Sequence, residues 1–408
     1  MIQVSNCDSR SPNVLRRTGS TNATPRQRKH YCLARLSILL TASALVGGII
    51  GCGSAADLEI RNWHDLYAVR DNLDGHYLLM NDLDSTTAGY AELASTAANQ
   101  GKGWQSIGTS DDPFGGTFDG QGHQISGMFI DRPDEYSVGL FGAVGETGVV
   151  ENVRIVNVTV MGEWAVGGLV GENWGDVYDA YSDGSVTGTD CVGGLVGANA
   201  GSVSSSCSTA DVTGHWDVGG LVGCSDSSGS IGNSYSVGNV TGEWAVGGLV
   251  GGNLGGTVAR SYSRGNVTGD DYVGGLIGDN QGVVGNSYSA SNVTGQWYVG
   301  GLVGDNDSSG VVGNSYASGS VAGDSFLGGL VGSNWGSVTN SFWDVDSSGV
   351  NESDGGTGKT TVEMYTIVTF SGEGWNIIAV ASGQADLAYV WNIVTGQFYP
   401  FLSWQPMS

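Results

Sequence analysis

Two short motifs in the C-terminal part of the sequence resemble known ligand loops. The string GGTGKT, which ends at Thr360, contains the Gly-Lys-Thr of a phosphate loop, but that pattern needs a glycine where Ser353 stands. The string DVDSSG, which begins at Asp344, copies the first half of a calcium loop, yet its twelfth position is Gly355 and not glutamate. We therefore predict no nucleotide site, and a tight turn rather than a metal site at DVDSSG.

The residue types that most often carry catalysis are scattered. The histidines that follow the first 56 residues stand in unrelated contexts, at His64, His76, His123 and His215. The sequence contains no H-E-x-x-H or G-x-S-x-G string, so neither a zinc protease nor a serine hydrolase is indicated. We expect no catalytic residues, no metal site and no cofactor.

The cysteines do not form a recognisable motif. They are Cys7, Cys32, Cys52, Cys191, Cys207 and Cys224. No C-x-x-C pair is present, which leaves zinc and redox sites without support. The last three cysteines are an odd number, and each replaces a different residue type of a repeating unit. We interpret them as small buried thiols, with a disulfide between two of them as the alternative.

One aromatic position of the repeating unit could bind a ligand. Five residues before the leucine of each unit, four units have tryptophan, at Trp164, Trp216, Trp244 and Trp297. Other units have Asp190, Asp271 or Ser325 there, so we predict that the position is exposed. Exposed tryptophans beside acids such as Glu163 could stack on sugar rings; the alternative is that they shield the backbone at a corner. Glu163 and Asp190 would also meet the carboxylate spacing of a glycosidase, by geometry alone.

A tandem repeat positions these residues. The string VGGLVG or a near copy recurs with its leucine at Leu169, Leu195, Leu221, Leu249, Leu276, Leu302 and Leu330, after a shorter relative at Leu140. The spacings lie between 26 and 29 residues, which is typical of a solenoid. Each unit also contains blocks of the forms V-x-x-S-Y-S and G-x-V-T-G, and no unit has a run of helical periodicity.

The three blocks predict an all-β fold. Short apolar runs bounded by glycine, asparagine and serine indicate three strands per unit, hence a three-faced parallel β-solenoid of about eight coils with the repeat leucines in its core. A propeller is excluded because one blade needs about 40 residues. Glycine makes up 71 of 408 residues, and we expect it at the coil corners, where a positive φ or a close backbone approach is required.

The V-x-x-S-Y-S block allows two interpretations. Strict alternation places Val284, Asn286 and Tyr288 on one face of a strand, so the asparagine would point inward. The same position holds Arg260 in another unit, and a buried unpaired charge is costly. Either the strand bends at this position, or the face that carries the serines, such as Ser287, is the inner one.

The first 56 residues are predicted to be an export leader. Seven of the 15 basic residues precede residue 36, and residues 36–56 carry no charge, which is the order of a signal sequence. The apolar run ends in Ile49-Ile50-Gly51-Cys52, which resembles a lipobox, so Cys52 is the predicted lipidation site. An ordinary signal peptide or an uncleaved anchor is the alternative, and all three place the body outside the cytoplasm. That body has eight basic and 39 acidic residues, which disfavours nucleic acid as a partner.

The order of the three blocks resembles a known repeat. Gly-Gly-Leu-x-Gly, followed by N-S-Y-S and G-x-V-T-G, is similar to the GLUG repeat family of bacterial and archaeal secreted and cell-surface proteins, over about residues 104–404. The resemblance implies exposure at the cell surface and a scaffold role, and it implies no reaction.

These observations divide the chain into a leader (1–56), an N-terminal cap (57–103), the solenoid repeats (104–345) and a C-terminal linker and cap (346–408). Asn62 is predicted to begin a helix in the first cap, and the aromatic residues after Trp375 are predicted to close the other end of the solenoid.

The function expected is that of a secreted or cell-surface protein with a structural or adhesin-like role and no activity of its own. We expect a monomer, with surface glycans or other surface proteins as partners, and contact with a membrane only through the leader or its lipid. The alternatives are a glycan-binding solenoid that uses the tryptophans and a carbohydrate-active lyase or hydrolase.

Overall fold

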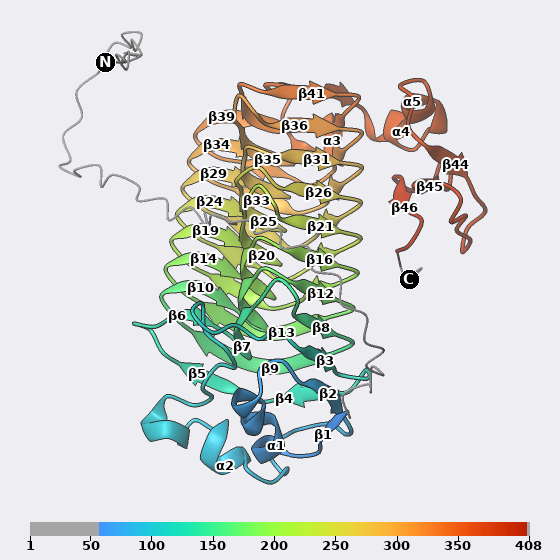
Figure 1. Cartoon of the computed structure of the whole chain (residues 1–408). Helices are drawn as coiled ribbons and strands as arrows, with labels where there is room; N and C mark the ends of the chain where they lie inside the picture. Colours follow the sequence, from blue (N-terminus) through green and yellow to red (C-terminus); the bar gives the residue numbers. More distant parts are fainter. Residues whose placement is uncertain (1–56, 406–408) are drawn as a thin grey trace, which may run out of the picture. The chain divides into compact units, whose positions relative to one another are not determined.

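The computed structural model describes residues 57–405, and it confirms the parallel β-solenoid that the repeat predicted (Figure 1). The predicted lipidation site, Cys52, lies outside the described residues. Eight coils follow one another between Tyr136 and Asp344, and each contributes to four sheets. We number the sheets I to IV in the order in which a coil passes through them.

Sheets I and II each contain eight parallel strands, one from each coil. Sheet I consists of β6 (Tyr136–Val138), β10 (Trp164–Gly167), β14 (Asp190–Gly193), β19 (Trp216–Gly219), β24 (Trp244–Gly247), β29 (Asp271–Gly274), β34 (Trp297–Gly300) and β39 (Ser325–Gly328). Sheet II consists of β7 (Phe141–Val144), β11 (Val170–Asn173), β15 (Val196–Asn199), β20 (Val222–Ser225), β25 (Val250–Asn253), β30 (Ile277–Asn280), β35 (Val303–Asn306) and β40 (Val331–Asn334). The repeated VGGLVG string spans the corner between the two sheets.

Sheets III and IV complete each coil. Sheet III consists of β1 (Leu58–Ile60), β2 (His76–Leu79), β3 (Thr117–Asp119), β8 (Val149–Glu151), β12 (Asp176–Tyr178), β16 (Ser202–Ser204), β21 (Ser230–Gly232), β26 (Thr257–Ala259), β31 (Val283–Gly285), β36 (Val311–Gly313) and β41 (Ser337–Thr339). Sheet IV consists of β4 (Gln124–Ser126), β5 (Phe129–Asp131), β9 (Arg154–Met161), β13 (Tyr181–Thr187), β17 (Cys207–Ser208), β18 (Asp211–Thr213), β22 (Tyr235–Ser236), β23 (Val240–Thr241), β27 (Tyr262–Ser263), β28 (Asn266–Thr268), β32 (Tyr288–Ser289), β33 (Asn292–Thr294), β37 (Tyr316–Ala317), β38 (Val321–Ala322), β42 (Phe342–Asp344) and β43 (Thr357–Lys359). The expectation of three strands per coil was therefore wrong, because the VGGLVG block breaks into two strands at its Gly-Leu corner.

The interior of the solenoid is apolar and repeats from coil to coil. The seven repeat leucines are fully buried, and so are the valine or isoleucine residues that follow them at the start of each sheet II strand. Burying one such side chain stabilises a fold by about 1.5–3 kcal/mol. The stacked aliphatic layers are thus the main source of the solenoid's stability.

Most glycines of the coils allow close backbone contact and do not turn the chain. A Cβ atom at Gly251 would lie 2.3 Å from backbone atoms of both Asp217 and Val218. Sheets I and II therefore touch through their backbones at positions where only glycine fits. Of the glycines between Tyr136 and Asp344, only Gly184, Gly255 and Gly265 have a positive φ.

Non-glycine residues make the left-handed turns instead. The second residue of each sheet I strand has φ between 49° and 56°. The residue between sheets III and IV has φ between 47° and 53° in every coil, and we call this set the corner column: Asn152, Asp179, Ser205, Asn233, Arg260, Asn286, Asn314 and Asn340. Asparagine tolerates this conformation better than most residues. Both interpretations of the block are confirmed, because the strand bends at this position and the serines that follow it, such as Ser287 and Ser289, are fully buried.

Two sets of buried polar side chains form hydrogen bonds from coil to coil. The amide of Asn253 donates to Asn280 (2.8 Å), and the amide of Asn280 donates to Asn306 (2.7 Å). A buried serine follows the corner residue in six coils, and we call this set the serine column: Ser206, Ser234, Ser261, Ser287, Ser315 and Ser341. In this column the backbone N–H of Ser261 donates to Ser287 Oγ (3.2 Å), which in turn donates to the carbonyl of Gly285 (2.9 Å). An unpaired buried polar group costs about 1–3 kcal/mol, so these two columns favour one register of coil on coil.

Short helices and strands cover the first coils. Helix α1 (Trp63–Ala68) begins at Asn62, whose side chain accepts hydrogen bonds from two backbone N–H groups of the first turn. The other helical segments of this region are η1 (Val69–Asp71), α2 (Tyr90–Leu93) and η2 (Ala98–Gly101). The indoles of Trp63 and Trp104 are fully buried beneath them, which continues the apolar interior to this end.

The last coil is closed by the segment that contains the two loop-like motifs. The backbone N–H of Gly329 donates to Glu352 O (2.9 Å), and that of Asp354 donates to Val331 O (3.1 Å). In the DVDSSG string, the buried Asp344 side chain caps helix α3 (Val345–Ser348), so the string is a turn. In the GGTGKT string, β43 pairs with β42 as a strand, where a phosphate loop would need a loop before a helix.

Candidate functional site

An outward-facing column of aromatic and acidic residues runs along sheet I. We call the first residues of these strands the aromatic column; its aromatic members are Tyr136, Trp164, Trp216, Trp244 and Trp297. Trp216 pairs directly with Trp244, and Asp271 stands between Trp244 and Trp297. The side chains of Trp216, Trp244 and Trp297 are 39%, 38% and 47% exposed, whereas Trp164 is less so. The column is therefore open to a ligand over several coils.

A second set of rings, which sequence reasoning missed, widens this surface in the later coils. Tyr272, Tyr298 and Phe326 are the second residues of their strands, where φ is positive. Ring centroids lie 5.6 Å apart for Trp244 and Tyr272, and 5.3 Å apart for Tyr272 and Tyr298. Tyr298 stacks on Phe326 at 4.7 Å. The signal in the sequence was an aromatic residue directly after the first position of the strand in three successive coils.

Carboxylates lie among these rings. Burial raises the pKa of Asp271 to about 6, and the neighbouring Asp270 adds to the effect. Burial also raises the pKa of Asp305, and it raises the pKa of Tyr272 to about 12. At neutral pH the surface therefore presents carboxylate acceptors and a phenol donor between flat apolar rings, a combination that suits hydroxyl-rich ligands.

A disulfide joins neighbouring coils beside the aromatic column. Cys191, the second residue of β14, is bonded to Cys224 in β20, with 5.1 Å between their Cα atoms. The interpretation as small buried thiols was therefore wrong for two of the three cysteines, and the alternative, a disulfide between two of them, is confirmed. Cys207 remains a free, half-buried thiol on sheet IV, and burial raises its pKa. Asp190, Asp217 and Cys191 lie within 4.8 Å of one another, but the disulfide removes the sulfur as a thiolate ligand.

The structure does not gather the carboxylates and histidines into one centre. Glu163 and Asp190 lie on neighbouring coils, as the backbone bond from Asp190 N to Glu163 O (3.1 Å) requires. His123 contacts Asp82 (3.0 Å) beside sheet IV, whereas His215 contacts Glu243 (3.2 Å) beside sheet I. The arrangement on sheet I can bind through ring faces and acceptors. At its first strand, the hydroxyls of Ser137 and Ser110 donate to the Glu172 carboxylate, and neither His123 nor His215 contacts this group.

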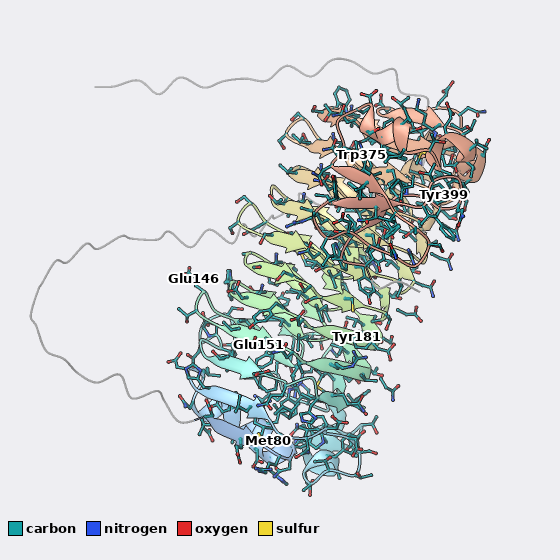
Figure 2. The ribbon with its side chains drawn as sticks, turned by 90° about the vertical axis from the view of Figure 1, so that its right-hand side faces the viewer. Met80, Glu146, Glu151, Tyr181, Trp375 and Tyr399 are labelled. Carbon is teal, nitrogen blue, oxygen red and sulfur yellow. A yellow bond between two sulfur atoms is a disulfide. The ribbon has the colours of Figure 1, made fainter. Side chains whose placement is uncertain are left out.

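A second column of rings lies on sheet IV and is mostly covered. Tyr235, Tyr262, Tyr288 and Tyr316, which we call the tyrosine column, stack with centroids 4.9–5.0 Å apart and ring planes within 7° of parallel. Residues 361–405 form a C-terminal unit that lies along this column. Burial raises the pKa of Tyr288 to about 12. The sequence predicted that these last residues close the end of the solenoid, whereas they cover its flank (Figure 2).

The C-terminal unit consists of α4 (Thr361–Met364), α5 (Ile367–Ser371) and a small sheet of β44 (Ile377–Ala379), β45 (Trp391–Ile393) and β46 (Phe401–Leu402). Hydrogen bonds fix it to three successive coils. Tyr316 donates its hydroxyl hydrogen to Pro400 O (2.6 Å), the Gln405 amide donates to the Tyr288 hydroxyl (2.6 Å), and the Trp404 indole donates to Arg260 O (3.1 Å). These contacts account for the burial of the rings on an outer face.

None of the helices within residues 57–405 has both the length and the apolar character that crossing a bilayer requires. Membrane contact through the leader remains an expectation from the sequence.

Comparisons with known proteins support the repeat assignment. The sequence model of the GLUG motif matches residues 162–187 and 242–268, and each match falls within one coil. Halomucin from Haloquadratum walsbyi is 35% identical over 149 residues, which are 35% of this chain and 2% of that protein. A protein of Evansella cellulosilytica, named as a Gly-rich membrane protein, is 39% identical over 103 residues, which are 24% of this chain and 11% of that protein. The chain thus matches only a small part of each relative.

Two solved structures have similar chain traces. A candidate immunoglobulin A1 protease from Bacteroides ovatus aligns over 85% of this chain and 92% of its own, with 20% identity and a TM-score of 0.41. An IgA1 protease aligns over 62% of this chain and 21% of its own, with 19% identity and a TM-score of 0.46. At these scores we infer nothing about activity from either one. The matches to the GLUG motif lie in two of the eight coils, in agreement with the resemblance that the sequence indicated.

Proposed function

We propose that this chain is an exported cell-surface scaffold with a structural or adhesin-like role and no catalytic activity of its own. The uninterrupted run of eight coils carries the proposal, because the leucine, serine and asparagine columns continue with few breaks from one coil to the next. A catalytic centre would need unlike residues gathered at one place on the stack, and the two departures from the repeat that lie together, Cys191 and Cys224, are joined in a disulfide. The relative named as a membrane protein is consistent with this role.

The disulfide supports the export part of the proposal. Cys191 and Cys224 form a bridge between neighbouring coils, and such bridges persist mainly in oxidising compartments outside the cytoplasm. The strongly acidic composition after Cys52 keeps a protein soluble and monomeric at such a site.

Export can be tested by labelling and fractionation of cells that express the full chain. We expect the chain in the envelope fraction, cleavable by added protease in intact cells, and labelled by a radioactive fatty acid. Cys52→Ser should abolish the fatty-acid label, whereas Cys32→Ser should leave it unchanged. Recovery of the chain in the cytosol, with Cys191 and Cys224 reduced, would contradict the proposal.

Glycan binding through the aromatic column is a second candidate. It is favoured by the partial exposure of Trp216, Trp244 and Trp297, on a surface that also carries the ionised Asp271. A polysaccharide chain that runs along the stack would meet one ring or acceptor on each coil, about every 4.8 Å.

The double variant Trp216→Ala/Trp244→Ala tests this candidate. We expect it to lose about tenfold or more in affinity for any polysaccharide that the full chain retains in a pull-down, since two aromatic contacts of about 1 kcal/mol each are removed. Trp335→Ala is the matched control, because Trp335 is exposed but lies outside sheet I. Equal loss in the control, or no loss in the double variant, would exclude the column as a glycan site.

A further inference from the structure

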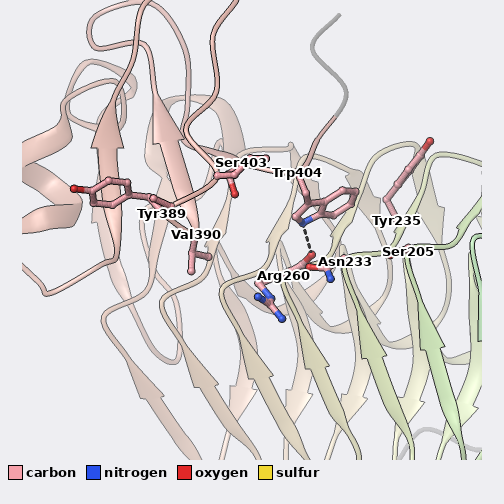
Figure 3. A pocket seen from close by; sticks show the side chains of 10 residues that line it. Ser205, Asn233, Tyr235, Arg260, Tyr389, Val390, Ser403 and Trp404 are labelled. Carbon is pink, nitrogen blue, oxygen red and sulfur yellow. Dashed lines mark hydrogen bonds between the residues drawn. The ribbon is translucent and has the colours of Figure 1, made fainter.

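A groove of about 580 Å³ lies between the corner column and the C-terminal unit (Figure 3). Its lining comes from both sides, with Asn233, Tyr235 and Arg260 from the coils and Val390, Ser403 and Trp404 from the C-terminal unit. This volume is within the range of small-ligand sites, which run from about 300 to 1,000 Å³. The groove lies on another face of the coils from the aromatic column and plays no part in the role proposed above.

The floor of the groove consists of three corner residues from successive coils. Ser205, Asn233 and Arg260 all have φ near +50°, which bends the chain outward at each of them. The next member, Asn286, is covered, because the Trp391 indole donates a hydrogen bond to its side chain (3.4 Å). The groove therefore ends where the C-terminal unit meets the column, and Arg260 is the last open position.

Arg260 is the chemically distinctive residue of the floor. The other corner positions hold asparagine, aspartate or serine, and the body has only eight basic residues against 39 acidic ones. Arg260 is exposed and forms no ion pair with any residue between 57 and 405. The Trp404 indole donates a hydrogen bond to the backbone carbonyl of Arg260 (3.1 Å). The backbone of Arg260 is therefore fixed, while its guanidinium can bind a ligand.

Aromatic rings and neutral polar groups complete the groove. The rings of Tyr235 and Trp404 lie 6.3 Å apart with an angle of 30° between their planes, and both are half-buried. Figure 3 shows the Asn233 amide near Trp404, with Val390 and the Ser403 hydroxyl on the opposite side. A flat apolar face, a hydrogen-bonding amide and hydroxyl, and one cation thus occur within a single groove.

We propose that this groove binds an acidic saccharide, with the sugar carboxylate on Arg260 and the sugar ring against Trp404 and Tyr235. Arginine binds carboxylates through two parallel hydrogen bonds, and such charged bonds are about twice as strong as neutral ones. The ring faces suit the apolar C–H face of a sugar, and Asn233 and Ser403 suit its hydroxyl groups. A single cation in an anionic protein favours a ligand with one carboxylate per unit over a polyphosphate.

The corner column itself supplies the variants for a test. Arg260→Asn and Asn233→Asp each introduce a residue type that the column already holds at the same φ, at Asn286 and Asp179, so both should fold. Calorimetric titration of the full chain compares the trimer of galacturonic acid with the neutral trimer of galactose. We expect the acidic trimer to bind at least tenfold more tightly. Each variant should remove most of this preference, and added salt should weaken it.

Two further variants show whether the preference belongs to this groove. Arg61→Asn removes an exposed arginine elsewhere, and Trp244→Ala alters the aromatic column. Neither variant should change the preference for the acidic trimer, whether or not the aromatic column binds glycans. The proposal is overturned if the two trimers bind equally, if neither binds at 10 mM, or if Arg260→Asn binds the acidic trimer as the original chain does. It is also overturned if a short peptide with a free C-terminal carboxylate, or acetate alone, binds as tightly as the acidic trimer.

Discussion

Replacement of Gly251 by alanine is expected to destabilise the solenoid by about 3 kcal/mol or more, which is the upper range for overpacking. The new Cβ atom would lie 2.3 Å from backbone atoms of Asp217 and Val218, and backbone cannot move aside as a flexible side chain can. Sheets I and II of neighbouring coils would have to separate. Thermal unfolding followed by circular dichroism measures the effect, and hydrogen exchange of amides near Leu249 reports whether the damage is local.

Gly285→Ala is the matched control for this prediction. Gly285 also lies in a strand of the solenoid, but a Cβ atom there meets no other atom within 4 Å. Alanine at such a position is expected to be neutral or to stabilise the fold by up to about 1 kcal/mol, because it lowers the conformational entropy of the unfolded chain. Similar unfolding temperatures for the two variants would show that the sheets do not touch at Gly251 as described.

Removal of the disulfide is expected to have an effect of similar size. The bond closes a loop of 33 residues. For a loop of this length, the loop-entropy relation predicts that the double variant Cys191→Ala/Cys224→Ala loses about 3–4 kcal/mol of the free energy of unfolding. Urea unfolding under non-reducing conditions measures the change. The single variant Cys207→Ala, which removes the free thiol, should cost much less because that side chain is only half-buried.

Peptide mapping provides the independent check on the pairing. Digestion without reduction should yield one crosslinked pair that contains Cys191 and Cys224. If Cys207 appears in the crosslink, or if the double variant unfolds at the same urea concentration as the original chain, the pairing or its contribution to stability is wrong.

The repeat alone was enough to predict the fold class, but not the number of sheets. Period, block order and strand-forming residues indicated a parallel solenoid of about eight coils, and this was confirmed. The break of VGGLVG into two strands was missed because alternation treats Gly168 and Leu169 as strand residues, whereas they form a corner. Periodicity measures spacing along the chain and carries little information on where a glycine permits two backbones to meet.

The corner column shows what the sequence could and could not decide. Exchange of Asn233 for Arg260 and Asp179 indicated an exposed position, and a positive φ explains it, since a left-handed residue turns its side chain away from the strand face. The buried asparagine column went unnoticed, although six of the seven VGGLVG strings carry asparagine two residues later. A polar residue that recurs at the same position beside an apolar block in successive repeats indicates a hydrogen-bonded column.

The candidate sites were harder to predict because they depend on contacts between coils. The tryptophans were found from their exchange with aspartate, but the disulfide joins residues whose separation of 33 matches no repeat spacing. The groove could not be predicted, because it forms where the C-terminal unit meets Arg260, and 144 residues separate Arg260 from Trp404.

The uniformity of the tyrosine column has a consequence for how this protein can change in length. The C-terminal unit contacts rings on four successive coils, so duplication of a whole coil upstream of Tyr235 would lengthen the stack by about 4.8 Å and leave every one of those contacts in place. Loss of a coil between Tyr262 and Tyr316 would shift the unit by one position, so that Trp404 would lie against Tyr235 and Cys207 in place of Tyr262 and Tyr235. Duplication of coils upstream can therefore vary the reach of the solenoid while the contacts of the C-terminal unit stay intact, whereas loss of a coil beneath the unit replaces one of its rings by the Cys207 thiol.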